Sequence, residues 1–68
     1  MKNLIKVERA RHNLTQAELA EKVKVARQTI IAIEAGKFVP SATLAFKIAC
    51  ILNCKADDIF KLEDEDWL

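Results

Sequence analysis

The stretch TQAELAEKVKVARQTIIAIEAGKFVP, residues 15–40, decides the fold of this 68-residue chain. It opens with Thr15 and Glu18, which have the spacing of a capping box, where each side chain binds the backbone amide of the other residue. Such a box is typical of the first turn of a helix. We therefore expect a helix at residues 16–23.

A second helix is expected at residues 27–35, after a turn at residues 24–26. Gly36 ends this helix, because glycine takes the left-handed conformation of a helix cap without a steric cost. In both helices the apolar residues recur at helical spacing, which predicts one buried face on each. The residues on these faces are Leu19, Ala20, Val23, Ile30 and Ile33.

The flanking segments predict three more helices. These are residues 4–12, residues 42–52 after a Ser41 cap, and a short helix with Asp57 in its first turn. The chain is thus predicted to be all-α, with five helices in one domain over residues 1–68. The inward residues of the flanking helices are Ile5, Leu44, Ala45, Ile48, Leu52, Ile59 and Phe60.

The 27–35 helix carries Arg27, Gln28, Ile31 and Ala32 on the face opposite the core. Arginine pairs with guanine and glutamine with adenine through two hydrogen bonds, each pairing worth about 1–3 kcal/mol of discrimination. A three-residue turn makes the two helices cross steeply, so this face projects from the molecule. The pattern predicts a helix-turn-helix, in which the second helix lies in the major groove of double-stranded DNA.

The segments TQAELAEKV, RQTIIAIEAGK and VPS resemble the Xre/Cro-type helix-turn-helix family, which includes the phage repressors and many small bacterial and archaeal regulators. The resemblance covers roughly residues 4–60. It implies a lambda-repressor-like DNA-binding domain of five helices, with the third helix in the major groove. One departure is Lys24, because the family often has glycine in the turn. A left-handed residue other than glycine costs about 1–2 kcal/mol, so the angle of the third helix stays open.

Several side chains are candidate contacts to DNA phosphates. The resemblance implies that Gln16, the first residue of its helix, donates a hydrogen bond to a phosphate and orients the motif without contacting bases. Thr29 either binds a phosphate or hydrogen-bonds within its own helix. Three basic residues are either phosphate contacts or solvated charges, namely Arg11, Lys37 and Lys6.

Arg9 and Glu34 are candidate structural partners. The resemblance implies that they form a partly buried ion pair, which holds the third helix against the first. Loss of one partner from a buried pair costs about 3–5 kcal/mol. The alternative is that Arg9 contacts a phosphate.

Ile31 and Ala32 form an apolar pair at positions where the family often has polar residues. Thymine methyl groups in the major groove are one apolar partner for this pair. The alternatives for Ile31 are a contact with a partner protein, or simple exposure, since single exposed isoleucines are common.

Charge is distributed unevenly along the chain. Residues 1–37 hold eight lysines and arginines against four acids, a net charge of +4, and residues 38–68 hold three lysines against six acids, a net of −3. Such asymmetry suits a protein with one face on a polyanion and another on itself or a partner. Related proteins bind palindromes as two-fold dimers, so we expect a homodimer through the acidic half. Its candidate contacts are Phe46, Ile51, Trp67 and Leu68.

Alternatives stay open for the acidic half. In one, Phe46 and Ile51 complete the core and Trp67 folds back over the first helix. A short strand pair between the N-terminal residues and Lys61–Glu63, at the start of the acidic tail 61–68, is an addition to the five-helix fold.

Other classes of function have little support in the sequence. Cys50 and Cys54 are expected to be buried or half-buried thiols in a reducing compartment. A metal site would need two more ligands, and the only histidine, His12, is far away in the sequence. One histidine, one serine and no phosphate-binding loop argue against an enzyme, and no cofactor is expected. No apolar run approaches the ~20 residues of a membrane span, so a cytoplasmic protein is expected.

These observations predict a sequence-specific, DNA-binding transcriptional regulator. We expect a repressor that binds a palindromic operator as a homodimer. The alternative is an antitoxin-like protein-interaction module that also binds its own operator and uses the tail with Trp67 for docking. Co-purification with a protein partner would distinguish the two.

Overall fold

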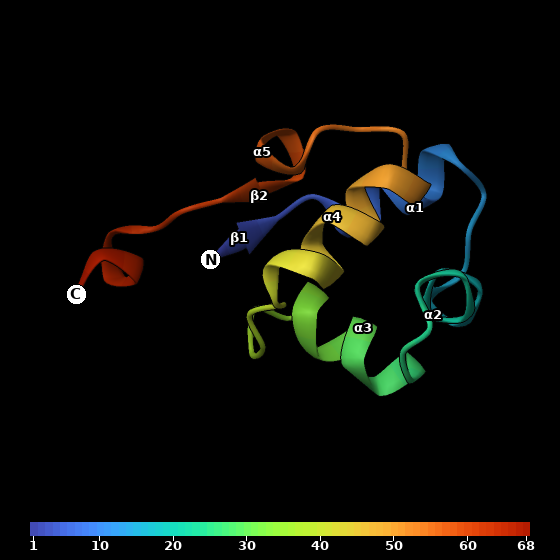
Figure 1. The fold of residues 1–68 in the computed structure, drawn as a ribbon, viewed down its shortest axis with the longest axis horizontal. Helices are drawn as coiled ribbons and strands as arrows, with labels where there is room; N and C mark the ends of the chain where they lie inside the picture. Colours follow the sequence, from blue (N-terminus) through green and yellow to red (C-terminus); the bar gives the residue numbers. More distant parts are fainter.

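The computed structural model describes residues 1–68 and contains the five predicted helices. They are α1 (Ile5–Arg11), α2 (Gln16–Val23), α3 (Arg27–Glu34), α4 (Ala42–Ile51) and α5 (Ala56–Ile59). The bounds of the first four differ from the expected ones by at most one residue at either end. Figure 1 shows α3 along one edge of the molecule, with α2 next to the start of α3 and α4 on its inner side.

The two ends of the chain meet in a small antiparallel sheet. β1 (Lys2–Asn3) pairs with β2 (Phe60–Lys61), so the pairing segment lies one residue before the expected start at Lys61. The register pairs are Lys2–Lys61 and Asn3–Phe60. A 3₁₀ helix, η1 (Asp64–Trp67), follows where the sequence indicated only an acidic tail.

The N-terminal ammonium group fixes η1 to the sheet. The Met1 nitrogen lies 3.0 Å from Glu63 Oε1 and 3.3 Å from Asp66 Oδ2. The hydrogen bond to Glu63 raises the pKa of the Met1 ammonium, and the Glu63 backbone amide lowers the pKa of Asp66. The alternative in which Trp67 folds back over α1 is wrong, because 76% of its surface is exposed.

Local side-chain caps determine where the helices begin. Thr15 Oγ1 accepts a hydrogen bond from the Glu18 amide at 3.0 Å, and Glu18 Oε1 accepts one from the Thr15 amide at 2.9 Å. The bond from the Thr15 amide lowers the pKa of Glu18. Ser41 Oγ accepts from the Leu44 amide at 3.2 Å. The expected capping box and serine cap are therefore both present.

Lys24 takes the left-handed conformation at the turn between α2 and α3, with φ 65° and ψ 43°. The Val25 amide donates to the Ala20 carbonyl at 3.0 Å, which is the closing bond of a Schellman cap. Three other residues are left-handed at chain turns, namely Asn13, Gly36 and Asn53. Lys24 thus adopts the backbone conformation that glycine would adopt at lower cost.

The core consists of ten buried apolar side chains contributed by all five helices and the residue after α4. They are Ile5, Leu19, Ala20, Val23, Ile30, Ile33, Ile48, Ala49, Leu52 and Ile59. Leu44, Ala45 and Phe60, which were expected in the core, are half-buried instead. The expected inward residues of α2 and α3 are all buried, so the core determines which face of α3 remains outside.

Two residues of α4 correct the sequence-based expectations. Cys50 is exposed rather than buried, because α4 turns the neighbouring Ala49 toward the core. Phe46 is 66% exposed, so the alternative in which it completes the core is wrong. Ile51, by contrast, packs half-buried against the core.

The second cysteine behaves as expected. Cys54 is half-buried, and its Sγ donates to Glu8 Oε1 at 3.4 Å. Burial and this carboxylate raise the pKa of the Cys54 thiol. Among the helices, none has both the length and the apolar character required to cross a bilayer.

The left-handed turn gives a first prediction. Replacing Lys24 with glycine removes a backbone strain of about 1–2 kcal/mol and adds entropy to the unfolded chain, which costs about 0.4–1 kcal/mol. We expect Lys24→Gly to raise the free energy of unfolding by roughly 0.5–1 kcal/mol and the melting temperature by about 3–6 °C. Thermal unfolding followed by circular dichroism measures this.

Lys24→Ala is the control, because it removes the same charge and keeps the Cβ atom. Its stability should stay close to that of the parent chain. A glycine variant less stable than the alanine variant would contradict the conformation assigned to this turn.

Candidate nucleic-acid interface

The outer face of α3 is formed by residues that the buried core leaves exposed. Ile30 and Ile33 face inward, with 0% and 1% of their surfaces exposed. Arg27 and Gln28 are exposed in the first turn, and Ile31 is 40% exposed one turn later. The structure therefore places these three expected base contacts on one outward face, and Ala32 and Thr29 lie half-buried at its margin.

Arg9 and Glu34 form the ion pair that the resemblance implied. Arg9 Nε donates to Glu34 Oε2 at 2.7 Å, and Arg9 Nη2 donates to Glu34 Oε1 at 3.2 Å. The two side chains are only 13% and 9% exposed. Arg9 Nη1 also donates to the Leu14 carbonyl at 2.8 Å. This bidentate, partly buried ion pair attaches the C-terminal end of α3 to α1 and to the segment that precedes α2.

Gln16 extends this pair into a chain of polar contacts. Its Nε2 donates to Glu34 Oε1 at 3.2 Å, and its Oε1 accepts a hydrogen bond from Arg27 Nη2 at 3.4 Å. The two bonds fix the orientation of the Gln16 amide. One of its two N–H groups remains free, because a primary amide has two donors. No sequence pattern indicated this link between α2 and both ends of α3.

Asn3 is a second structural contact that sequence analysis missed. Its Nδ2 donates to the Ile33 carbonyl at 2.8 Å, and its Oδ1 accepts from the Ile5 amide at 3.3 Å. Asn3 therefore joins β1 to the end of α3 and also satisfies an amide at the start of α1. An asparagine just before a helix is a common capping signal, which was the available clue.

Phe38 lies next to the outer face of α3. It is 48% exposed and follows the Gly36 turn. Together with Gln28, Thr29 and Ala32 it lines a shallow hollow of about 260 Å³. The signal available in the sequence was an aromatic residue two positions after Gly36, where α3 has ended.

The remaining basic candidates lie in different places. Lys37 is exposed in the loop that follows α3. Lys6 and Arg11 lie on α1, and Arg11 pairs with Glu8 at 3.3 Å. Glu34 is the one acidic residue of α3 and is neutralised by Arg9, so Arg27 gives the outer face a positive charge.

Comparison with known proteins places this arrangement in a family. The helix-turn-helix family model matches residues 5–59. The chain is 59% identical to an uncharacterized HTH-type transcriptional regulator of Methanocaldococcus jannaschii over 66 residues, which are 97% of this chain and 100% of the relative. It is 48% identical to the uncharacterized HTH-type transcriptional regulator YgzD of Bacillus subtilis, over 97% of this chain and 100% of the relative. The chain therefore belongs to the helix-turn-helix family of DNA-binding transcriptional regulators.

A solved structure supports the same assignment of fold. A chain of the SinR protein/SinI protein complex matches this chain with a TM-score of 0.77 and 26% sequence identity. The match covers 93% of this chain and 67% of that chain. The predicted lambda-repressor-like, five-helix architecture is thus confirmed.

The Arg9–Glu34 pair gives a second prediction. Arg9→Ala should lower the free energy of unfolding by about 3 kcal/mol, because it leaves the Glu34 carboxylate without its partner in a partly buried site. Urea unfolding measures this. Arg11→Ala is the matched control, because Arg11 is 70% exposed, although its partner Glu8 is 13% exposed, and a pair with one member in water contributes about 0–1 kcal/mol. Equal losses in the two variants would contradict the bracing role of Arg9.

Proposed function

We propose that this member of the helix-turn-helix family is a sequence-specific repressor that binds a palindromic operator as a homodimer, with α3 in the major groove. One observation carries the proposal. The Arg9–Glu34 pair and the buried isoleucines hold α3 rigidly, while Arg27 and Gln28 stand exposed in its first turn. A rigid helix with free donors at its start suits contact with base edges.

Arg27 and Gln28 are the proposed polar base contacts. The Arg27 guanidinium has five donors, of which only one is used, in a 3.4 Å bond to Gln16. The other donors are free for guanine O6 and N7. Gln28 makes no hydrogen bond through its side chain within the protein, so its amide is free to pair with adenine.

Gln16, Thr29 and Lys37 are the proposed phosphate contacts on the α2–α3 side. Gln16 is the first residue of α2 and has one free amide N–H, and the positive end of the helix dipole at this position also favours phosphate. Lys6 and Arg11 are proposed as contacts to flanking phosphates only, since they lie on α1.

Ile31 and Ala32 are the proposed apolar base contacts. Phe38 borders the same hollow as Ala32. Thymine is the one standard base with a methyl group on its major-groove edge, so this apolar surface favours sites containing thymine. We propose repression because a dimer seated on an operator blocks access of other proteins to the same groove.

A second candidate function is supported by two observations. The structural neighbour comes from a complex of two different proteins, SinR and SinI. In this chain Phe46 and Trp67 are exposed, which suits docking of another protein. The second candidate is therefore an antitoxin-like module that binds a protein partner and its own operator.

Selection from random duplex DNA tests the proposed function. We expect one palindromic sequence to be enriched over the non-specific background, and Gln28→Ala to change the preferred base at one position in each half-site. Gln16→Ala is the control, because loss of a phosphate contact weakens binding to all sequences about equally. The absence of any enriched sequence would refute operator binding.

Uracil substitution in the selected operator tests the apolar contacts. Uracil lacks the thymine methyl, so replacing a contacted thymine should weaken binding about fourfold, which corresponds to ~0.8 kcal/mol for one buried methyl group. In the Ile31→Ala variant, the loss of affinity caused by uracil should become smaller at one thymine in each half-site. Val7→Ala, an exposed apolar residue of α1, should keep the full sensitivity. If no thymine responds, Ile31 contacts something other than a base.

A further inference from the structure

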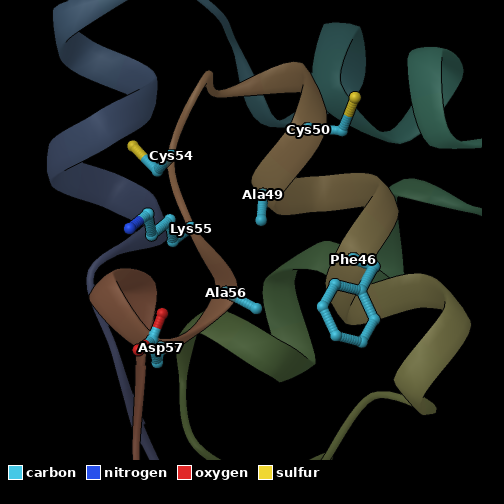
Figure 2. Close-up of a pocket in the computed structure, with 7 residues that line it drawn as sticks. All are labelled: Phe46, Ala49, Cys50, Cys54, Lys55, Ala56 and Asp57. Carbon is cyan, nitrogen blue, oxygen red and sulfur yellow. The ribbon is translucent and has the colours of Figure 1, made fainter.

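The outer surface of α4 carries two neighbouring hollows that share Cys50; we call them together the α4 groove. The larger, of about 500 Å³, lies between α4 and the segment that enters α5 and has an apolar wall containing Phe46, Ala49 and Ala56. Figure 2 shows Phe46 and Ala49 on α4, facing Ala56 across this hollow. The smaller, of about 310 Å³, lies between α4 and the end of α2, over Val23 and Ile51.

Lysines surround the apolar floor of the α4 groove. Lys22, Lys24 and Lys47 line the smaller hollow, and Lys55 lines the larger one. None of the four takes part in an ion pair. Asp57 is the one acidic residue along the groove. The groove therefore suits a partner that combines an apolar side chain with negative charge.

The chain itself contains a segment with this chemistry. This segment is the C-terminal tail, which consists of η1 and Leu68. Trp67, the last residue of η1, is 76% exposed, and Leu68 is fully exposed. Asp64 and Glu65 form no ion pair, whereas Glu63 and Asp66 hold the Met1 ammonium. The tail is thus fixed in position. It presents an exposed tryptophan beside two carboxylates that have no ion-pair partner.

A tail cannot fill the smaller hollow of its own chain in this fold. Figure 1 shows the C-terminus at one end of the longest axis and α2 at the opposite end. The molecule extends 34 Å along this axis, and the pairing of β2 with β1 anchors the tail at its own end. No tail residue lines the larger hollow either, and 76% of the surface of Trp67 is exposed. The groove of one copy is therefore accessible to the tail of another copy.

We propose that, in the homodimer, the tail of each copy docks in the α4 groove of the other. Trp67 enters the apolar hollow and packs against Phe46 of the partner copy, and Asp64 and Glu65 face the lysines around Lys47. A two-fold axis makes this exchange reciprocal, so the dimer is closed. None of the groove residues lies on α3, so the proposed DNA-binding face stays free. The inference rests on the homodimer of the proposed function and names its contacts.

Sedimentation equilibrium of the full chain tests the tail exchange. The parent chain should be a dimer at micromolar concentration. Trp67→Ala should raise the dimer dissociation constant at least about 30-fold, as expected for a buried aromatic anchor. The melting temperature of the monomer should be unchanged, because Trp67 makes no core contact. The fluorescence of Trp67, the only tryptophan, should shift to longer wavelength on dilution through the dissociation constant.

A charge swap distinguishes a dimer formed by docking of the tail in the α4 groove from a dimer formed through another surface. Lys47→Glu and Asp64→Lys should each weaken the dimer about tenfold, and the double variant should regain the parent affinity within a few-fold. Lys6→Glu, the same charge change on α1, should have no effect on the dimer.

The outcomes separate the two proposals. A parent chain that stays monomeric at high micromolar concentration would refute the homodimer and, with it, the tail exchange. A parent dimer that keeps its affinity in Trp67→Ala, or is not restored by the charge swap, would refute the tail exchange alone.

Discussion

The ion pair between Arg9 and Glu34 is the interaction on which the functional part of this structure depends. It lies where α1, α3 and the segment before α2 meet, and both side chains are largely removed from solvent. Water competes little for hydrogen bonds in such a place, so a bidentate pair fixes direction as well as distance. Because Gln16 shares the same carboxylate, the pair orients α2 and α3 relative to each other.

This constraint lets a small domain present a rigid helix. A core of ten apolar side chains is modest, and by itself it would not fix the ends of an eight-residue helix. Asn3 and Arg9 hold the C-terminal end of α3, while Gln16 contacts Arg27 at its N-terminal end. Side chains held by such contacts lose less entropy when they meet a ligand, which favours selective binding of DNA.

The fold was largely predictable from sequence because its signals are local. The capping box at Thr15 and the stop at Gly36 act within a few residues, and both are present in the structure. The turn at Lys24 forms even though glycine is absent. The free-energy cost of one left-handed residue is smaller than the stabilisation from the core contacts that the turn permits. Cys50 was misjudged because α4 has only two polar residues, Thr43 and Lys47, and so few do not show which face of the helix is buried.

The sequence by itself determined the helices, their caps, the buried faces of α2 and α3 and the residues that project from α3, because periodicity and capping act over a few residues. The Arg9–Glu34 pair came from resemblance to a family and not from any local pattern. Only the tertiary structure decided that Gln16 meets Glu34, that Asn3 meets Ile33, that Phe38 borders the outer face of α3, and that an apolar groove along α4 is surrounded by lysines. The two hydrogen bonds join residues 18 and 30 positions apart, and such contacts depend on how whole helices pack rather than on neighbouring residues.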